Sequence, residues 1–499
     1  MRALLLTLLG CADNDPVGDT DSGTTIDPMD TGTPPPSGFT MTLEAVSVRV
    51  VQGASARVGV TLSRDDGYDG PVALAVTGLP AGVEAAATTA PAGADAWEIE
   101  LTASGSASPG GPFAVTVLGS PDDGDLETAE IGLFVAGPPG SPDPSFSFDG
   151  TLTYDIDPQE SEGLNALAFD ARGRLLAAGQ RGTSDAEGFL LRFTDDGALD
   201  TDFGPQGAGP AFPDGAVAQM VVRAGDAPLV LARRELGYFV AAVTIDGAPE
   251  TAWGAGGEAV LSVNSNNTYP GLLQPSTGRT LAVTPDAIRE LDTGGTENAA
   301  FAPSAQTLER NASTTLDLDE HILVGGTGDD VYAIERRDPD GVLDPTFGVD
   351  GQLRFGAGVQ NCWVRALAPT ADGGGLGVAM WFPSSVPENP ILFRFDAAGQ
   401  LDAAFGSGGT VELATGLSVY SEVAEQADGR IVVVGTDFIT SRVERFNPDG
   451  SRDLSFGTAG VVELAGSGRG LLLDEVAGRI VVGVADPNTE GIDILRLWQ

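Results

Sequence analysis

Carboxylates are the only ionisable groups that are plentiful enough in this chain to build several kinds of site. The sequence has 71 acidic residues, one histidine (His321), two cysteines (Cys11 and Cys362) and no lysine. The missing lysine excludes Schiff-base chemistry and a P-loop lysine. A Ser-His-Asp or Cys-His arrangement would need His321, and no Gly-x-Ser-x-Gly elbow accompanies it. We therefore predict no catalytic residue. We interpret His321 as a surface residue at a strand entry and Cys362 as a buried apolar residue.

Acidic loops are the features that could hold a metal ion. Zinc needs several His or Cys ligands, which the sequence lacks, whereas calcium takes oxygen ligands alone. Solvated turns explain these loops as well, so calcium stays an alternative and no other cofactor is predicted. Carboxylates could also serve a hydrolase or lyase in pairs, but they are too numerous for one pair to stand out. The calcium candidates are Asp65, Asp66, Asp69, Asp122, Asp123 and Asp125.

The charge balance limits the partners of the chain. The 26 basic and 71 acidic residues give a formal net charge of −45. Such a field repels phosphate backbones, so we predict no nucleic-acid partner and no docking on an anionic membrane surface. The 499 residues predict more than one domain, and 69 Gly and 33 Pro are typical of a loop-rich β protein.

A short phrase recurs seven times, and it predicts the elements around any site. Each copy has a glycine, an acid two or three residues later, and an aromatic residue six positions after the glycine. The glycines are Gly140, Gly197, Gly247, Gly295, Gly341, Gly399 and Gly450. The acids are Asp143, Asp200, Glu250, Glu297, Asp344, Asp402 and Asp453. The aromatic residues are Phe146, Phe203, Trp253, Phe301, Phe347, Phe405 and Phe456.

The residue types of the phrase predict a structural role. A glycine at positive φ and an acid that accepts backbone N–H groups favour a tight turn. The aromatic residue is an apolar plug that a repeat can bury only against its neighbour. An arginine stands five residues before four of the glycines and predicts a repeated ion pair with the turn acid. These arginines are Arg192, Arg336, Arg394 and Arg445.

Residues 141–499 therefore predict a seven-bladed β-propeller. Each repeat has four short strands and no helical period, as in Leu164–Phe169, Leu175–Gly179 and Gly188–Phe193. The strand near 150–156 has no blade before it, whereas the chain stops in the last strand of repeat seven. We expect residues 150–156 to complete the last blade; closure by packing alone is the alternative.

The repeats also resemble a known family. The pattern Leu-Asp-x-x-Phe-Gly, Asp-Gly-Arg-Ile-Val-Val-x-Gly and Arg-Phe-x-x-Asp-Gly is similar to the delta-60 repeat, and repeats one, five and six fit it best. The resemblance implies a propeller in a secreted or surface protein of bacteria, with no general activity. Repeats two, three and four depart from the pattern, either because their blades are irregular or because a ligand surface has displaced it.

The first 137 residues predict three further segments. Residues 1–11 resemble a bacterial lipoprotein signal whose lipobox, Leu8-Leu9-Gly10-Cys11, implies lipidation of Cys11. Residues 12–38 are rich in Asp, Thr, Gly and Pro and predict a disordered tether. Residues 39–137 alternate with period two between turn clusters. They predict a β-sandwich and resemble bacterial immunoglobulin-like modules.

Taken together, the sequence predicts an all-β protein of the bacterial cell envelope: a disordered N-terminal tether, a small Ig-like sandwich and a seven-bladed propeller. A lipid on Cys11 would hold it at the outer membrane or cell surface. The propeller would bind an extracellular protein, glycan or other ligand without catalysis. The alternative is an extracytoplasmic hydrolase or lyase that uses carboxylates in the propeller channel.

Overall fold

The computed structural model describes residues 38–499 with short gaps, and within them the chain is all-β, as predicted. The gaps are 65–67, 123–124, 183–185, 214, 235–236, 263–269, 285–286, 309, 357–361, 382–389, 415–416, 418 and 486–490. Cys11 and residues 12–37 of the predicted tether lie outside the described residues. None of the described residues belongs to a helix that is long and apolar enough to cross a membrane.

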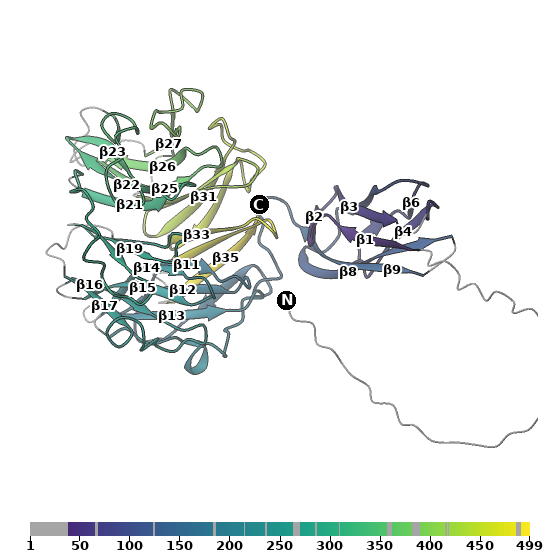
Figure 1. Cartoon of the computed structure of the whole chain (residues 1–499), viewed down its shortest axis with the longest axis horizontal. Coiled ribbons are helices and arrows are strands. Elements are labelled where there is room, and N and C mark those ends of the chain that lie inside the picture. Colours follow the sequence, from purple (N-terminus) through teal and green to yellow (C-terminus); the bar gives the residue numbers. More distant parts are fainter. Residues whose placement is uncertain are drawn as a thin grey trace, which may run out of the picture.

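The first nine strands form two sheets around one core (Figure 1). One sheet has the order β1-β3-β7-β5, and the other has the order β2-β9-β8-β4-β6. Alternate apolar residues of β3, such as Val58, Val60 and Leu62, are buried between the sheets, as the period of two requires. The strands are β1 (Phe39–Leu43), β2 (Ser47–Val51), β3 (Ser55–Arg64), β4 (Val72–Thr77), β5 (Val83–Ala85), β6 (Thr88–Ala90), β7 (Ala96–Ala103), β8 (Gly110–Pro121) and β9 (Glu127–Ala136).

Seven small antiparallel sheets follow in the described part of the chain, and they are the blades of a propeller. Blade 1 has β11 (Glu162–Phe169), β12 (Leu175–Arg181) and β13 (Glu187–Phe193), followed by the 3-10 helix η1 (Pro205–Gly207). Blade 2 has β14 (Ala216–Val222), β15 (Pro228–Arg234), β16 (Gly237–Ala242) and β17 (Glu258–Ser262). Blade 3 has β18 (Gly271–Leu273), β19 (Thr280–Val283) and β20 (Ile288–Leu291).

The remaining blades each have four strands. Blade 4 has β21 (Arg310–Leu316), β22 (Ile322–Gly328), β23 (Val331–Arg337) and β24 (Gln352–Phe355). Blade 5 has β25 (Cys362–Pro369), β26 (Gly375–Trp381), β27 (Ile391–Phe395) and β28 (Thr410–Glu412). Blade 6 has β29 (Val419–Glu425), β30 (Ile431–Thr436), β31 (Thr440–Phe446) and β32 (Val461–Ala465). Blade 7 has β33 (Ser467–Asp474), β34 (Arg479–Ala485), β35 (Ile492–Trp498) and, from before blade 1, β10 (Thr151–Tyr154).

The ring closes through β10, as the sequence predicts. β10 pairs antiparallel with β35, with Thr151 opposite Leu495 and Tyr154 opposite Ile492. The first phrase also supplies the turn of blade 7, because Asp143 N–H donates to Arg496 O over 2.8 Å. The same bond joins Asp200 to Arg192 and Asp453 to Arg445 in other blades. Blade 7 is thus built from both ends of the propeller sequence.

A chain of hydrogen bonds connects successive turn phrases around the rim. In most copies, the residue that follows the aromatic residue donates its N–H to the carbonyl of the residue that precedes the glycine of the next phrase. Gly204 N–H donates to Asp246 O over 2.7 Å, and Gly348 N–H donates to Ala398 O over 2.7 Å. The last hydrogen bond of this series links the seventh phrase to the first, with Gly457 N–H donating to Pro139 O over 2.9 Å. Each phrase therefore ties one blade to the next.

Blade 3 departs from the four-stranded pattern in its outer part. Residues 303–308 follow its turn phrase but form no strand. Instead, the buried guanidinium of Arg337 in blade 4 donates to Ser304 O over 2.8 Å and to Ala305 O over 2.9 Å. Thr307 N–H donates to the buried Glu335 carboxylate over 3.0 Å. Side chains of the next blade therefore replace sheet hydrogen bonds here, which fits the irregular phrase of this repeat.

Candidate functional site

The inner strands of all seven blades converge on one central channel. Each inner strand packs against the next around the ring, in the order β11, β14, β18, β21, β25, β29 and β33, and β33 returns to β11. Figure 1 shows several of these strands around the middle of the propeller. A pocket of about 290 Å³ lies there and is lined by residues of every blade.

One residue of each inner strand lines this channel at the same position in its blade. We call these seven residues the channel ring. Each stands five positions before the residue that opens the following hairpin turn, as Asn165 stands before Asp170 and Arg365 before Thr370. The channel ring comprises Asn165, Ala218, Pro270, Ala312, Arg365, Ser421 and Arg469.

Backbone bulges aim these side chains into the channel. The pairing of the inner strand with its neighbour shifts at the ring residue in six blades, for example between Leu164 and Ala166 and between Val364 and Ala366. A bulge adds one residue to one strand and redirects its side chain, and bulges are frequent beside functional sites. In blade 3 the ring residue, Pro270, directly precedes β18.

The channel ring has two chemically different sides. Blades 5, 6, 7 and 1 contribute the polar residues Arg365, Ser421, Arg469 and Asn165, whereas blades 2, 3 and 4 contribute Ala218, Pro270 and Ala312. The apolar side coincides with the repeats that depart from the delta-60 pattern.

Cations dominate the charged lining of the channel. The charged residues of the described lining are Arg233, Arg365, Arg469 and Glu422, three cations and one acid. The whole chain carries a formal charge of −45, so the net charge of the channel lining is opposite in sign to that of the whole chain. A cationic pocket in an acidic molecule favours an anionic ligand over a cationic one.

Glu422 lines the channel beside the ring residue Ser421. Its Oε1 accepts a hydrogen bond from Gly470 N–H over 3.2 Å. Burial raises the pKa of Glu422 to about 7, while Gly470 N–H, Arg469 and Arg365 lower it. The carboxyl is therefore partly protonated near neutral pH, so the charge of the channel changes there.

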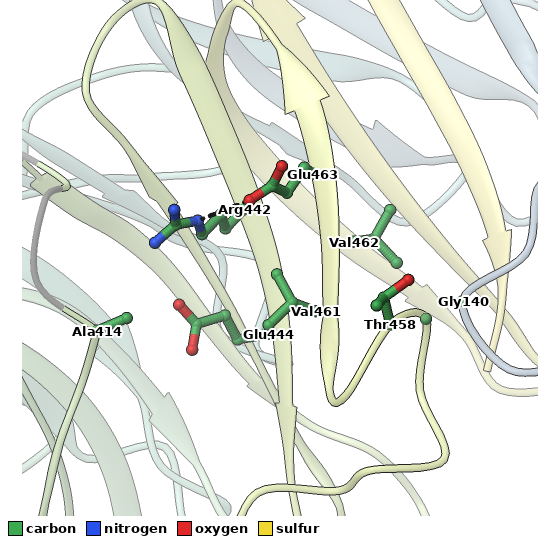
Figure 2. A pocket seen from close by; sticks show the side chains of 9 residues that line it. Gly140, Ala414, Arg442, Glu444, Thr458, Val461, Val462 and Glu463 are labelled. Atoms are coloured by element: carbon green, nitrogen blue, oxygen red, sulfur yellow. Dashed lines mark ion pairs between the residues drawn. The ribbon is translucent and has the colours of Figure 1, made fainter.

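A second pocket lies on the rim, near the strands β31 and β32 (Figure 2). Its volume is about 560 Å³, and Gly140 of the first turn phrase also lines it. Its charged groups are already paired: Arg442 Nε lies 3.4 Å from Glu463, and Glu444 lies 2.6 Å from Arg452 and accepts a hydrogen bond of 2.6 Å from Tyr420 O–H. This pocket is larger than the channel pocket. Its charged residues already pair with neighbouring side chains, so we assign them a structural role.

A third hollow, of about 640 Å³, lies on the open face of the sandwich sheet that contains β3 and β7. Its charged residues Arg57 and Glu98 pair over 2.8 Å, and Trp97 Nε1–H donates to Thr88 Oγ1 over 3.0 Å. Strands β3 and β7, Thr88 of β6 and neighbouring residues line the hollow, whereas all seven blades line the channel. We therefore take the channel as the candidate site.

The predicted turn residues lie at the rim and hold the scaffold together. Six of the seven aromatic residues are at most 2% exposed, and Phe301 is half-buried. Asp200, Asp344 and Asp453 lie 2.7–2.9 Å from Arg192, Arg336 and Arg445, and Asp402 lies 3.7 Å from Arg394. The predicted ion pair is therefore present in four blades. Arg496 completes the set in blade 7, with its Nε 2.8 Å from Asp143.

One turn acid was assigned wrongly from the sequence. Asn298, not Glu297, occupies the turn position of the fourth phrase, since Asn298 Oδ1 accepts from Ala300 N–H over 3.0 Å. Aspartates fill this role in other blades, as when Asp402 Oδ1 accepts from Ala404 N–H. An amide oxygen can accept this hydrogen bond as well as a carboxylate can, which explains why the turn tolerates the exchange.

The remaining sequence candidates do not converge on the channel. His321 directly precedes β22 and contacts Asp317 over 3.0 Å, as Arg174 contacts Asp170 in blade 1. Cys362 is buried in the core between blades 4 and 5.

The calcium candidates are only partly within the described residues. Asp69, Asp122 and Asp125 are exposed, whereas Asp65, Asp66 and Asp123 lie outside that part. Among the residues that the structure describes, no three His, Cys, Asp or Glu side chains are grouped as metal ligands would be. Calcium binding stays an alternative to solvated turns.

The channel ring itself was not identified from the sequence. Its signal is available there, however: the fixed offset of five residues before each hairpin turn. Aligning the repeats on that turn places Asn165, Arg365 and Arg469 in one column with small residues. A column that varies within a regular repeat is typical of a position that the scaffold does not determine.

Comparisons with known proteins agree with a β-propeller. A family described as a domain of unknown function (DUF5122) beta-propeller matches residues 426–456, which span β30, β31 and the turn at Phe456. No curated protein matches the sequence. The fold and the channel thus define this protein as a β-propeller protein.

Two solved structures are similar to this chain at a low level. Streptogramin B lyase is 13% identical with a TM-score of 0.45, over 70% of this chain and 97% of that chain. Prolyl oligopeptidase B from Galerina marginata is 10% identical with a TM-score of 0.39, over 67% of this chain and 49% of that chain. The match thus spans about half of the latter protein. Likenesses at this level concern the fold alone and carry no argument about activity.

Proposed function

We propose that this protein is a lipid-anchored protein of the bacterial cell envelope, whose propeller binds a ligand, glycan or protein without catalysis. The observation that carries the binding half is the channel ring: each of the seven blades contributes one residue to a common pocket, six of them from a bulged strand. The lipobox-like Leu8-Leu9-Gly10-Cys11 and the acidic segment 12–38 support the anchor.

Carboxylate-pair catalysis in the channel receives less support. A glycosidase-type mechanism needs two carboxyl groups about 5–10 Å apart. Glu422 is the one carboxylate in the described lining of the channel. We therefore develop binding rather than hydrolysis.

The anchor is tested by mass spectrometry of the N-terminus of the protein purified from membranes. We expect a mature chain that begins at Cys11 and carries the mass of a diacylglyceryl group. Cys11→Ser should abolish the lipid and release the protein from the membrane fraction. Cys362→Ala changes the second cysteine, which is buried in the propeller, and should keep the lipid. An unmodified Met1 or Cys11 would remove the anchor.

The binding half is tested on glycan and protein arrays with the full chain carrying Cys11→Ser. We expect ligands whose binding is lost when Ala218→Trp fills the channel. Ala404→Trp, at an exposed turn on the rim, is the matched control and should bind as before. Binding that survives Ala218→Trp would place the ligand elsewhere and contradict the role of the channel.

A further inference from the structure

We propose that the propeller channel binds a small organic carboxylate. This inference rests on the proposed function and deepens it by naming the class of ligand. The carboxylate group would lie between Arg365 and Arg469. The apolar part of the ligand would face Ala218, Pro270 and Ala312.

The two arginines are suited to hold one anion. They come from β25 and β33, which flank β29 on either side. Both line the same pocket as Glu422 of β29, and both lower the pKa of its carboxyl electrostatically. A guanidinium presents a planar fork of N–H donors that matches a carboxylate in two parallel hydrogen bonds. Ser421 of β29 and Asn165 of β11 add polar groups on this side of the ring.

The channel-ring positions on the opposite side favour an apolar group. Ala218, Pro270 and Ala312 present small apolar side chains from three successive blades. These side chains leave room beside them, although Gln219 and Arg233 of blade 2 also line the pocket. Ligand pockets commonly combine such an apolar wall with a few polar groups that fix orientation. A volume of about 290 Å³ limits the ligand to a small molecule.

Glu422 would control the affinity of this site. The ionised carboxylate competes with the ligand for the two arginines, whereas the protonated carboxyl does not. Gly470 N–H is its hydrogen-bond donor from β33. The site should therefore take up an anion more readily when Glu422 is neutral.

The experiment is isothermal titration calorimetry of the full Cys11→Ser chain with hexanoate, its neutral analogue hexanamide, and acetate. We expect hexanoate to bind, acetate to bind more weakly, and hexanamide not to bind. Arg365→Met and Arg469→Met should each weaken hexanoate binding by about tenfold or more, as loss of a charge-assisted pair implies. Arg57→Met, whose side chain is 68% exposed on the sandwich, should leave it unchanged.

Further variants keep the test decisive if a methionine variant folds poorly. Arg365→Lys keeps the charge but loses the fork, so it should bind hexanoate with intermediate affinity. Glu422→Gln should strengthen binding at pH 8 by about fivefold and change it little at pH 5.

Three results would overturn the proposal: hexanamide binding as tightly as hexanoate, hexanoate affinity unchanged in both arginine variants, or no heat from hexanoate at millimolar concentration. If one of these results is found but the arrays still show ligands whose binding Ala218→Trp blocks, the ligand is not a carboxylate, and the proposed binding function is retained.

Discussion

At the scale of single residues, two buried carboxyl groups carry raised pKa values. Burial raises the pKa of Glu422 and of Glu162 to about 7, from an ordinary value of 4.5. The charges of Arg469 and Arg365 lower the pKa of Glu422, whereas those of Asp155 and Asp157 raise the pKa of Glu162 further. The folded protein therefore holds protons that the unfolded chain releases. This stabilisation is complete below pH 4.5 and is lost as the pH rises through about 7.

Glu422→Gln should remove its share of this pH dependence. We expect the variant to be more stable than the parent at pH 8 by roughly 3 kcal/mol, and similar at pH 4.5, because each pKa unit corresponds to about 1.4 kcal/mol. Denaturant unfolding at both pH values measures the difference. Glu162→Gln is the matched variant outside the channel: it should flatten the stability profile similarly but leave hexanoate binding unchanged. A Glu422→Gln profile parallel to that of the parent would show that Glu422 titrates normally.

The turn ion pairs should differ in strength according to their burial. Asp453 and Arg445 are 8% and 2% exposed, whereas Asp402 and Arg394 are 37% and 14% exposed. Asparagine keeps the side-chain oxygen of the turn and removes the charge. We therefore expect Asp453→Asn to cost about 3 kcal/mol, since it leaves a buried arginine poorly compensated. Asp402→Asn should cost less than about 1 kcal/mol. Equal losses in urea unfolding would mean that burial does not set the strength of the pair.

At the scale of the element, the phrase glycine joins one blade to the next. Gly399 has φ +75°, and a Cβ there would lie 2.6 Å from Gly348 N and 2.8 Å from the Phe347 ring. Gly173, in an inner hairpin, has φ +78° but meets nothing within 4 Å. Both glycines adopt the left-handed conformation that other residues disfavour, so only Gly399 adds a steric requirement.

Gly399→Ala should therefore cost much more stability than Gly173→Ala. We expect about 1 kcal/mol for Gly173→Ala, from backbone strain alone. For Gly399→Ala we expect at least about 3 kcal/mol, because Phe347 and the backbone of the neighbouring turn must also move. Thermal and urea unfolding of the two variants measure this difference. Similar losses would show that the contact with Phe347 relaxes freely.

The regular part of each blade could be predicted because local chemistry determines it. The phrase glycines, turn acids and aromatic residues stand at fixed spacing, and the Arg192–Asp200 pair follows from that spacing. The bulge at Arg365 could not be predicted in this way, because one extra residue barely disturbs an apolar alternation. The outer part of blade 3 could not be predicted either, because its structure depends on hydrogen bonds with Arg337 and Glu335 of blade 4.

At the scale of the whole molecule, both chain segments that meet at blade 7 share one buried ion network. Asp143 lies 2.8 Å from both Arg479 and Arg496. Arg479 also donates to Gly111 O of the sandwich over 2.9 Å, and its guanidinium lies 5.1 Å from the Phe134 ring. The sequence could predict that residues 150–156 close the ring, but not that Arg479 would also contact the sandwich. Closure and docking thus depend on the same arginine.

Closure should be the larger contribution to stability, and truncation separates the two. A chain of residues 138–499 lacks the sandwich but keeps the turn phrase, β10 and the bond from Gly457 to Pro139. A chain of residues 156–499 also loses Phe146, Leu152 and Asp143. Arg479 and Arg496, 2% and 5% exposed, would then lack their shared carboxylate, and β35 would become an open edge.

We therefore expect the 138–499 chain to unfold cooperatively near the midpoint of the full chain, and the 156–499 chain to unfold many degrees lower or to aggregate through its open edge. Calorimetry measures the midpoints, and light scattering measures the association. Asp143→Asn in the 138–499 chain is the intermediate case, since it keeps β10 and weakens only the ion network. If 156–499 matched 138–499 in midpoint and stayed monomeric, packing between blades alone would close the ring, and β10 would be dispensable.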